Sequence, residues 1–516
     1  MTYLAVPISA ENVKKAKQQI KTAKVAGAEL LELRTDYLEE LSTSLVETLI
    51  KACRPLPVIV TCRDVAQGGA RAYPSLLRVG VLAAAIYAGA EFVDLEYENF
   101  LPAQNQEKIL VALAKHSRTR LILSAHNFQS RFESITRINR DILSVYPAAI
   151  PKLVYTANHI NDCFEAFDLL RQSGGERIAF CMGQAGLISR IIAKKLGSLV
   201  TFACVDDKSA TAPGQLTIEE LKETYRFDKI DSDTELYGVI GTPVAHSLGP
   251  VVHNKCFSKI RANKLYLPIQ LDGGKEEFET FMQKIIARRW LDFRGFSVTL
   301  PHKQNALSFV RKSGGVIEPL AGKIDAANTL LVDMHGKVSA YNTDYAGALE
   351  AIRSTLKITN TKLASFNVAV IGAGGVARAV VAGLSDIGAK ITIYNRTIER
   401  GRNLADEFNC DFKPLDELPG TNAELLINCT SIGMHPDVKH SPLSKKHLRK
   451  GMAVFDTVYN PSQTLLLKNA ADKGAKTVDG LSMFISQAAA QFKLFTGQQV
   501  TTRFMRKTVS DCLARK

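Results

Sequence analysis

Long hydrophobic runs are absent from this sequence of 516 residues. The longest nearly uncharged apolar run, residues 79–90, is far shorter than the ~20 residues that cross a bilayer, so we expect neither a membrane span nor a membrane partner. The nine cysteines form no CxxC pair, which argues against a zinc site or a disulfide framework and favours reduced thiols in a cytosolic protein. We therefore expect no bound metal. The N-terminus also lacks the pattern of a signal or transit peptide.

Acidic residues are outnumbered, with 51 Asp and Glu against 65 Lys and Arg, and the formal net charge is +14. The basic residues are spread along predicted helix faces and no nucleic-acid-binding motif is present, so we expect no nucleic-acid partner. Small anionic substrates and a phosphorylated cofactor suit a basic surface at least as well. With 46% apolar and 22% charged residues, a chain of this length allows about three domains, or a barrel plus two.

In the first half of the chain, short apolar runs alternate with helical patterns eight times. The predicted strands cover residues 3–8, 30–34, 58–62, 92–97, 121–126, 152–155, 177–182 and 199–204. Eight strand–helix units within about 220 residues predict a closed (β/α)8 TIM barrel, an α/β fold. An open doubly wound sheet is the alternative, but no glycine-rich phosphate turn follows the first strand.

Polar residues follow the predicted strands, where a barrel would gather them at one face. They are Glu32, Arg34, Arg63, His126, Lys152, Arg190, Thr211 and Gln215. Lys152 lies in an apolar stretch, where desolvation and nearby arginines would lower its pKa and make a nucleophilic amine. Taken alone, Lys152 could begin its strand and reach solvent, and His126 could be an ordinary core histidine. Together they favour an imine-forming site for an anionic ketone.

Six motifs in chain order resemble those of type I 3-dehydroquinate dehydratases, over residues 1–225. They are Glu32-Leu-Arg34, Thr61-Cys-Arg63, Ser124-Ala-His126, Pro151-Lys152, Gly186-Leu-Ile-Ser-Arg190 and Ala212-Pro-Gly-Gln215. The resemblance implies that Lys152 forms a Schiff base with the substrate ketone, while His126 removes a proton and later protonates the leaving hydroxyl. It implies that Glu32 orients His126 or the substrate, and that Arg190 clamps the carboxylate. Further substrate contacts are implied for Arg34, Arg63, Thr211 and Gln215.

Two positions depart from the dehydratase pattern. Gln67 stands four residues after Arg63, where the family often has glutamate, so we expect a negative charge near Arg63 to be lost. Thr211 stands at the start of the last loop, where the family often has serine. The hydroxyl group is kept in that second exchange.

In the second half, an apolar strand beginning at residue 368 enters a glycine-rich turn, and a helix leaves it. The turn has the spacing Gly372-Ala373-Gly374-Gly375-x-Ala377. Such glycines allow a tight turn and let the backbone approach a pyrophosphate at the helix N-terminus. Because the turn has the strand–turn–helix context, it predicts a dinucleotide-binding site.

The next predicted strand, residues 390–394, ends in Asn395, Arg396 and Thr397. An NAD-binding site would place Asp or Glu there, whereas a guanidinium and a hydroxyl suit a 2′-phosphate. We therefore expect NADP(H) rather than NAD. Strands at 424–428, 453–456 and 475–478 complete a predicted Rossmann domain of about 130 residues.

A second α/β region, residues 236–345, precedes this turn. Lys303 follows Pro301 at a predicted strand-to-helix entrance, and Asp344 lies in a loop just before the cofactor domain. Each motif alone could be ordinary turn chemistry. A Lys/Asp pair that faces a cleft between two domains is a plausible proton-transfer couple for the interconversion of an alcohol and a ketone.

Nine ordered motifs make residues 236–516 resemble shikimate dehydrogenases. They are Pro243-Val-Ala-His-Ser247-x-x-Pro250-x-x-His253-Asn254, Val298-Thr-x-Pro-x-Lys303, Ala327-Asn328-Thr329, Asn342-Thr-Asp344, Gly372-Ala-Gly-Gly375, Asn395-Arg-Thr397, Asn428-x-Thr430, Asp456-x-x-Tyr459 and Asp479-Gly480-x-x-Met483-x-x-x-Gln487. The resemblance implies that Lys303, beside Asp344, is the main acid/base for hydride transfer from NADPH to 3-dehydroshikimate. Substrate binding is implied for Ser247, Thr299, Asn328, Tyr459 and Gln487. Cofactor binding is implied for Gly372, Ala373, Gly374, Gly375, Asn395, Arg396, Thr397, Thr430, Gly480 and Met483.

Two positions also depart from the dehydrogenase pattern. Gly249 stands where the family commonly has a second serine, which removes one hydrogen bond to the carboxylate, worth about 0.5 to 1.5 kcal/mol for a neutral pair. The affinity could fall about tenfold without loss of chemistry. Ser297 stands where many bacterial members have asparagine, whereas serine occurs there in plant-like members.

The product of such a dehydratase is the substrate of such a dehydrogenase, so the sequence predicts a bifunctional enzyme of the shikimate pathway. We expect a barrel at 1–228, a substrate-binding domain at 236–345 joined by helices at 483–516, and an NADP domain at 346–482. A linker of about 20 residues predicts that the two sites face each other. A quinate- and NAD-preferring dehydrogenase and a non-catalytic metabolite sensor are the alternatives. We expect the protein to be located in the bacterial cytoplasm, or in the plastid stroma if it is a mature plant-type protein.

Overall fold

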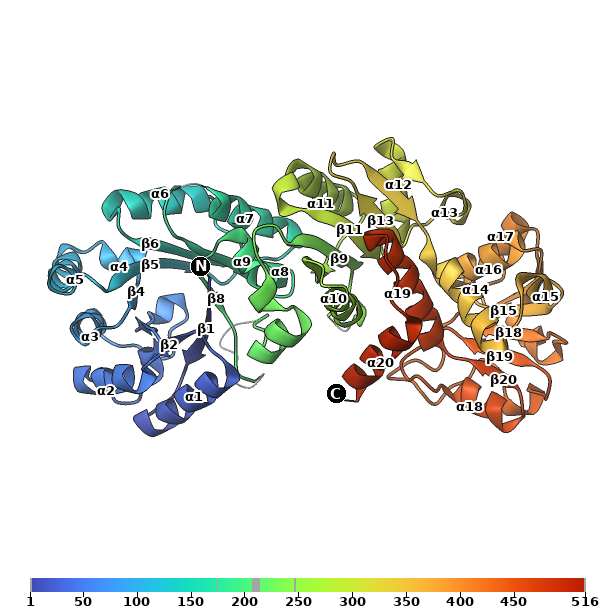
Figure 1. The fold of residues 1–516 in the computed structure, drawn as a ribbon, viewed down its shortest axis with the longest axis horizontal. Coiled ribbons are helices and arrows are strands. Elements are labelled where there is room, and N and C mark those ends of the chain that lie inside the picture. Colours follow the sequence, from blue (N-terminus) through green and yellow to red (C-terminus); the bar gives the residue numbers. More distant parts are fainter. Residues whose placement is uncertain (1, 173, 207–213, 246, 515–516) are drawn as a thin grey trace.

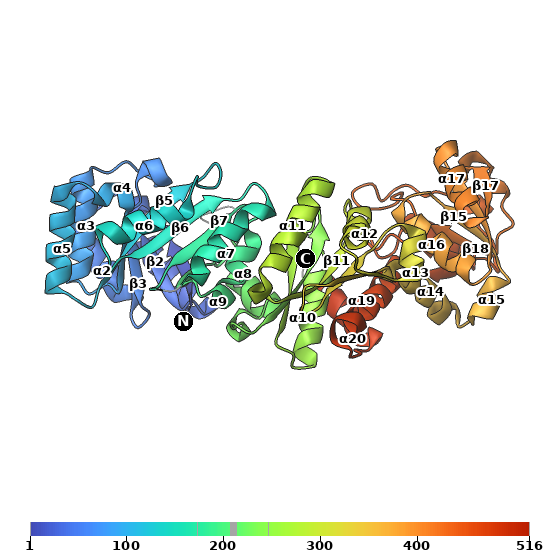
Figure 2. The ribbon, with the colours of Figure 1, turned by 90° about the horizontal axis from the view of Figure 1, so that it is seen from above.

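The computed structural model describes residues 2–172, 174–206, 214–245 and 247–514. Three sheets with flanking helices follow one another along the molecule (Figures 1 and 2). An eight-stranded sheet forms one end, a six-stranded mixed sheet lies in the middle, and a six-stranded parallel sheet forms the other end. Within the described residues, no helix is both long and apolar enough to cross a membrane.

The first sheet is a nearly closed barrel with the strand order β7-β6-β5-β4-β3-β2-β1-β8. Its strands are β1 (Tyr3–Ile8), β2 (Leu30–Arg34), β3 (Val58–Thr61), β4 (Phe92–Glu96), β5 (Arg120–Asn127), β6 (Ile150–Thr156), β7 (Ile178–Met182) and β8 (Val200–Phe202). Every recorded ladder is parallel. β7 and β8 approach where Leu199 N donates to Arg177 O (2.8 Å). The predicted (β/α)8 architecture is confirmed.

Helices surround the barrel. They are α1 (Val13–Ala26), α2 (Thr43–Cys53), α3 (Ser75–Tyr87), α4 (Tyr97–Phe100), α5 (Ala103–Lys115), α6 (Ile135–Val145), α7 (Cys163–Arg171), α8 (Leu187–Ile191) and α9 (Ala193–Leu196). The local sequence explains their ends. In α1, the Asn12 side chain accepts from Lys15 N, and Gly27 ends the helix at φ +90°, where a residue with a Cβ would be strained.

The middle sheet has the order β10-β9-β11-β13-β14-β12. Its strands are β9 (Glu235–Gly241), β10 (Lys264–Gln270), β11 (Phe293–Val298), β12 (Val316–Ile317), β13 (Thr329–Val332) and β14 (Val338–Tyr341). Its helices are α10 (Gly249–Lys259), α11 (Lys275–Ala287), α12 (Lys303–Lys312) and α13 (Pro319–Ile324). The last two helices of the chain, α19 (Gly480–Thr496) and α20 (Thr502–Leu513), return to pack against α10 (Figure 1). One apolar cluster joins Phe257 of α10 to Phe492 and Met505 of these helices.

The third sheet is parallel throughout, with the order β17-β16-β15-β18-β19-β20. Its strands are β15 (Asn367–Ile371), β16 (Lys390–Asn395), β17 (Asp411–Pro414), β18 (Leu425–Asn428), β19 (Ala453–Asp456) and β20 (Lys476–Val478). The helices are α14 (Thr343–Leu356), α15 (Asn360–Ala364), α16 (Gly375–Asp386), α17 (Ile398–Phe408) and α18 (Leu465–Asp472). Counted within this sheet, the order is 3-2-1-4-5-6, which is the Rossmann order.

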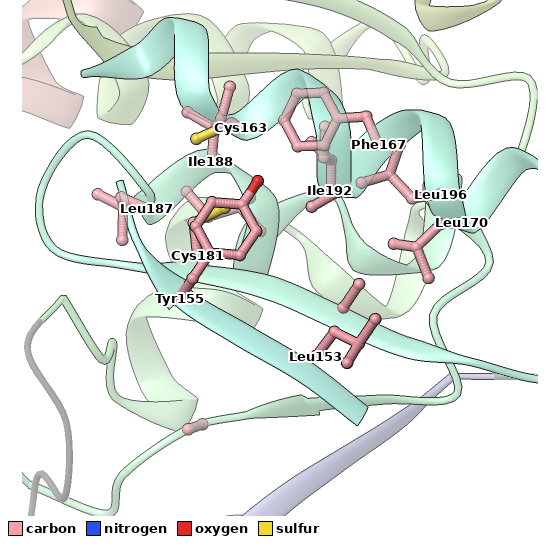
Figure 3. Packing of buried hydrophobic residues seen from close by; sticks show 14 of the residues in the cluster. Leu153, Tyr155, Cys163, Phe167, Leu170, Cys181, Leu187, Ile188, Ile192 and Leu196 are labelled. Carbon is pink, nitrogen blue, oxygen red and sulfur yellow. The ribbon is translucent and has the colours of Figure 1, made fainter. Parts of the chain in front are cut away.

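One continuous apolar core extends from the barrel into the middle sheet. Figure 3 shows its barrel side, where Tyr155, Cys163, Phe167 and other side chains of β6, α7, α8 and α9 pack together. Phe164 of α7 then meets Phe281 of α11, with ring centroids 6.0 Å apart. The third sheet instead has apolar clusters of its own.

Candidate active sites

The barrel carries a cavity of about 80 Å³ where polar residues from the ends of several strands meet. The sequence-predicted residues that line it are Glu32, Arg34, Arg63, His126, Lys152, Arg190 and Gln215. Thr211 lies outside the described residues. Chain segments more than 180 residues apart thus contribute to one cavity, as the barrel prediction required.

Lys152 lies inside β6 and is only 4% exposed, so it does not reach solvent. Its Nζ donates to Asp94 Oδ2 (2.7 Å) and lies 3.4 Å from Glu32 Oε1. Burial alone would raise the pKa of Asp94, but Arg63 and Lys152 hold the pKa of that carboxyl well below its ordinary value. Lys152 is therefore a buried amine between two carboxylates, a setting that sequence reasoning did not foresee.

Arg63 is held by three buried partners. Its guanidinium donates to Asp94 Oδ2 (2.9 Å), Glu96 Oε1 (2.9 Å) and Ser124 Oγ (2.7 Å). Although burial opposes the charge, Asp94 and Glu96 raise the pKa of Arg63 further above its ordinary value. Sequence reasoning missed Asp94 and Glu96. Their signal is their spacing, because residues two apart in a strand face the same side, here the inside of the barrel.

His126 is oriented by Gln67. Gln67 Oε1 accepts from His126 N (3.1 Å) and lies 3.0 Å from His126 Nδ1. An amide oxygen can only accept, so Nδ1 carries the proton and Nε2 keeps a lone pair. Burial, with the charges of Arg63 and Lys152, lowers the pKa of His126 well below its ordinary value, which favours a neutral ring.

Two expectations need correction in this barrel site. Gln67 contacts His126, so the exchange of glutamate for glutamine acts on the histidine and not mainly on Arg63. Glu32 accepts from Thr61 Oγ1 (2.9 Å) and lies beside Lys152, so within the described residues the side-chain partner of His126 is Gln67 and not Glu32. The other expected role of Glu32, orienting the substrate, stays a prediction.

Arg190 is the strongest candidate for an anion-binding group in the barrel cavity. It is 2% exposed, and its Nε and Nη2 have no hydrogen-bond partner among the described residues. Its guanidinium lies 4.4 Å from the ring centroid of Phe180, and burial lowers its pKa to about 10. A buried cation with free donors is unfavourable unless an anion pairs with it. Arg34 differs, because it makes two hydrogen bonds to Asp36 (2.9 and 2.8 Å).

A second cavity, of about 270 Å³, lies between the middle sheet and the helices that lead to the third. Ser247, Thr299, Lys303, Asp344, Tyr459 and Gln487 line it, all of them predicted. Lys303 begins α12, and its Nζ donates to Asp344 Oδ2 (2.5 Å) in the first turn of α14. The expected Lys/Asp couple is therefore present in the folded chain.

Among the predicted substrate-binding residues of this half that the structure describes, Asn328 is the one that does not line the cavity. Its Nδ2 donates to Asp344 Oδ1 (2.8 Å) and to Thr343 Oγ1 (3.0 Å), while its Oδ1 accepts from Thr343 N (2.7 Å). The amide is fully used within the protein. Asn328 thus fixes the orientation of the Asp344 carboxylate toward Lys303.

Gly249 lies in a tight part of the second cavity. A Cβ at this position would lie 3.1 Å from Tyr266 Cε1 and 3.2 Å from Ser247 Oγ. Behind it, the Tyr266 hydroxyl donates to Ser297 Oγ (2.6 Å), which donates to Gln491 Oε1 (2.8 Å). Tyr266 and Gln491 both line the cavity and were missed, because neither stands in one of the motifs.

The glycine-rich turn joins β15 to α16 and fits a dinucleotide. Gly372 has φ +108°, a left-handed conformation that favours glycine. At Gly374 and Gly375 a Cβ would meet nothing within 4 Å, so the N-terminus of α16 faces open space. A Cβ at Gly480 would clash with Val458 O at 2.4 Å. This end of the sheet can therefore receive a pyrophosphate.

The remaining predicted cofactor residues come from several segments of the same half of the chain. Thr430 Cγ2 would lie 3.1 Å from a Cβ at Gly372. Asn395 Nδ2 donates to Thr397 O (2.8 Å) at the end of β16, and Arg396 between them is exposed. Ala373 and Met483 pack against the apolar core of the third sheet. No group of three or more His, Cys, Asp or Glu able to hold a metal occurs within the ranges that the structure describes.

Family comparisons assign each half of the chain. The type I 3-dehydroquinase family model matches residues 4–232. Models of the shikimate dehydrogenase substrate binding domain, the shikimate/quinate 5-dehydrogenase and the shikimate 5′-dehydrogenase C-terminal domain match residues 239–330, 354–457 and 480–509. The chloroplastic bifunctional 3-dehydroquinate dehydratase/shikimate dehydrogenase of Arabidopsis thaliana is 35% identical over 510 residues, which is 96% of this chain and 82% of that protein.

The chain belongs to the family of bifunctional 3-dehydroquinate dehydratase/shikimate dehydrogenases. Its second half is also similar to single-function members. A shikimate dehydrogenase (NADP(+)) of Caldanaerobacter subterraneus is 37% identical over 278 residues, covering 52% of this chain and 94% of that protein. A crystal structure of a shikimate dehydrogenase with NADP+ superposes with a TM-score of 0.50 at 34% identity, covering 55% of this chain and 96% of that one.

Proposed function

We propose that the barrel dehydrates 3-dehydroquinate to 3-dehydroshikimate, and that the second half reduces 3-dehydroshikimate to shikimate with NADPH. The observation that carries the first step is one cavity lined by the buried Lys152, by His126 with its Nδ1 held by Gln67, and by the buried Arg190, whose Nε and Nη2 have no hydrogen-bond partner among the described residues. The observation that carries the second is the Lys303–Asp344 pair in the second cavity, in a half of the chain that also has an open dinucleotide turn. Because the predicted catalytic residues come together in both cavities, the structure argues against a non-catalytic sensor.

In the dehydratase, Arg190 pairs with the substrate carboxylate and directs the ketone toward Lys152. Lys152 Nζ attacks the ketone carbon, and loss of water gives an iminium that draws electrons from the neighbouring C–H bond. His126 Nε2 takes that proton and returns a proton to the departing hydroxyl, so that water leaves. A second water hydrolyses the imine and frees Lys152. Glu32 and Asp94 stabilise the positive charge on Nζ between these steps.

In the dehydrogenase, Lys303 donates a proton to the substrate carbonyl oxygen as the carbon is reduced. Asp344 holds the Lys303 ammonium in place, and Asn328 holds Asp344. Bound NADPH supplies the hydride. Ser247, Thr299, Tyr459 and Gln487 line the cavity and are proposed to bind the carboxylate and ring hydroxyls.

For the cofactor, we propose that the turn at residues 372–375 binds the pyrophosphate and that Arg396 and Thr397 bind the 2′-phosphate. Asn395, Thr430, Gly480 and Met483 complete the proposed cofactor site. The relatives named as NADP(+) enzymes support this choice over NAD.

We also propose the division into a barrel at 1–228, a substrate-binding domain at 236–345 with helices at 483–516, and an NADP domain at 346–482. The chloroplastic location of the Arabidopsis relative supports the plastid stroma as one of the two expected compartments. We propose that the partners of the protein, besides the cofactor, are the small anionic substrates.

A coupled assay tests both activities. Purified protein receives 3-dehydroquinate and NADPH, and loss of reduced-cofactor absorbance is followed. Lys152→Ala stops the signal, which added 3-dehydroshikimate restores, whereas Lys303→Ala accumulates 3-dehydroshikimate without oxidising NADPH. Lys17→Ala, an exposed lysine of α1, is the matched control and behaves as the unaltered protein. Failure of the unaltered protein with both substrates would instead support the sensor.

A further inference from the structure

The barrel and the dehydrogenase half meet through the region after β6 and the region around α11. Asp168 of α7 accepts two hydrogen bonds from Arg288, just after α11 (2.7 and 2.6 Å). Lys284 Nζ donates to Asn161 O (2.9 Å), and the aromatic contact of Phe164 lies beside these bonds. Polar and apolar contacts together fix how the two halves are docked at this point.

His159 contacts a loop that leads toward the dehydrogenase site. It follows β6, the strand that carries Lys152, and precedes a 3-10 turn at Ile160–Asp162. Its Nδ1 accepts from Asn161 N (3.1 Å), so this nitrogen is unprotonated and Nε2 carries the proton. Nε2 then donates to the backbone oxygen of Asp272 (2.9 Å), in the loop after β10. One imidazole thus caps a turn of the barrel and holds a loop of the dehydrogenase.

That loop bonds to two segments that carry residues of the dehydrogenase site. Asp272 Oδ1 accepts from Thr242 Oγ1 (2.7 Å), just beyond β9 on the segment that leads to Ser247. Leu271 O accepts from His302 Nε2 (2.7 Å), and His302 directly precedes Lys303. His302 is fully buried, so its backbone has little freedom to move away. The loop therefore fixes the residue that leads into α12.

We propose that His159 of the barrel is a positioning residue for the dehydrogenase, which it serves by holding the Leu271–Asp272 loop that anchors His302 and hence Lys303. The inference rests on the proposed role of Lys303. Displacement of a reacting group by about 1 Å can reduce a rate by about a hundredfold, so a loop held by a few bonds affects the rate measurably. The dehydrogenase half therefore depends on the barrel for more than the supply of substrate.

Two variants separate the local role of His159 from its role across the interface. His159→Asn places an oxygen where Nδ1 lies, so the 3-10 turn keeps its cap, but the shorter side chain does not reach Asp272. His159→Gln places an amide nitrogen near the position of Nε2, so the bond to Asp272 O is kept. We expect His159→Asn to lower kcat for 3-dehydroshikimate reduction about three- to tenfold, the range for one hydrogen bond, and His159→Gln to stay within about twofold.

Two further measurements identify the cause of any loss. KM for NADPH and the dehydratase kcat, measured on the same His159→Asn protein, are expected to stay within about twofold. An unchanged dehydrogenase kcat in His159→Asn overturns the proposal. Equal losses in the Asn and Gln variants, or a parallel loss of dehydratase activity, overturn it in favour of a purely local role. Absence of dehydrogenase activity in the unaltered protein would instead mean that the proposed function has failed.

A double-mutant cycle tests the route through Asp272. Thr242→Val removes the hydroxyl that donates to Asp272 Oδ1 and preserves the side-chain shape. If the loop carries the effect, the double variant with His159→Asn loses less activity than the product of the two single losses. Losses that multiply without interaction would refute the route.

Discussion

Replacing Gln67 by glutamate tests directly how residue 67 affects the pKa of His126, the proposed base of the dehydratase. Gln67 Oε1 lies 3.0 Å from His126 Nδ1 and keeps the proton there without adding charge. A carboxylate in the same place would accept the same bond and would also stabilise the protonated ring. The pKa of His126, which burial and the neighbouring cations now lower, would rise.

The size of this rise follows from the distance. Because the imidazolium charge is spread over its ring, the two charges would lie about 4 Å apart, where they attract by about 1 kcal/mol in water and about 4 kcal/mol at an effective dielectric constant of 20. One pKa unit corresponds to 1.36 kcal/mol, so the pKa of His126 should rise by about 1 to 3 units. A base works only when unprotonated, so dehydratase activity falls as the pH drops through this pKa. The acid limb of Gln67→Glu therefore lies at higher pH.

The assay is the pH profile of kcat for 3-dehydroquinate dehydration, followed by product absorbance. Gln67→Ala is the matched control, because it removes the orienting oxygen without adding charge. We expect it to lower kcat at all pH values and to leave the limb near its original position. An acid limb in Gln67→Glu that coincides with that of the unaltered protein would refute the assignment of His126 as the base oriented by residue 67.

Three further changes have defined outcomes. Asp94→Asn breaks a buried pair with Lys152 and should lower the free energy of unfolding by about 3 to 5 kcal/mol in urea titrations. Since the pKa of Asp94 is lowered on folding, this stabilisation is present above its unfolded pKa of about 4 and is lost as the pH falls below it, so the variant's stability should vary less with pH there. Arg396→Ala should raise KM for NADPH about ten- to a hundredfold and leave KM for NADH unchanged in steady-state kinetics. Arg288→Ala removes a partly exposed pair with Asp168, so its unfolding free energy should fall by only about 1 kcal/mol.

The sequence predicted the barrel strands well because they are short buried runs, most of them with a polar residue at or just after their end. The predicted strand at 30–34 matches β2, and Arg34 does end it. The Rossmann turn was equally clear, since a glycine such as Gly372 is required by the left-handed backbone there. Local physical constraints of this kind act within a few residues and are visible in any one segment.

Contacts between distant segments were harder to predict. Asp94 meets Lys152 across 58 positions, and the two side chains meet because β4 and β6 flank β5 in the curved sheet. Gln67 was recognised as a departure, but its partner depended on the path of the loop after β3. His159 reaches Asp272 across 113 positions and depends on the docking of the two halves, for which no single segment carries a signal.

The continuous apolar core determines which parts of the molecule unfold together. The two chemistries divide near residue 230, but the largest apolar cluster runs through the barrel and the middle sheet to Ala340, and the third sheet has its own main clusters. A small cluster of Ile324 and Ala326 with Ala379 and Ala382 crosses this second boundary. Heating should therefore melt the barrel and the middle sheet as one cooperative unit and the nucleotide-binding sheet as another. NADP+ should delay mainly the second transition, since a ligand stabilises the unit that binds it. A cut in the linker would leave an apolar face on each fragment, so the boundary between activities is a poor place to separate the chain.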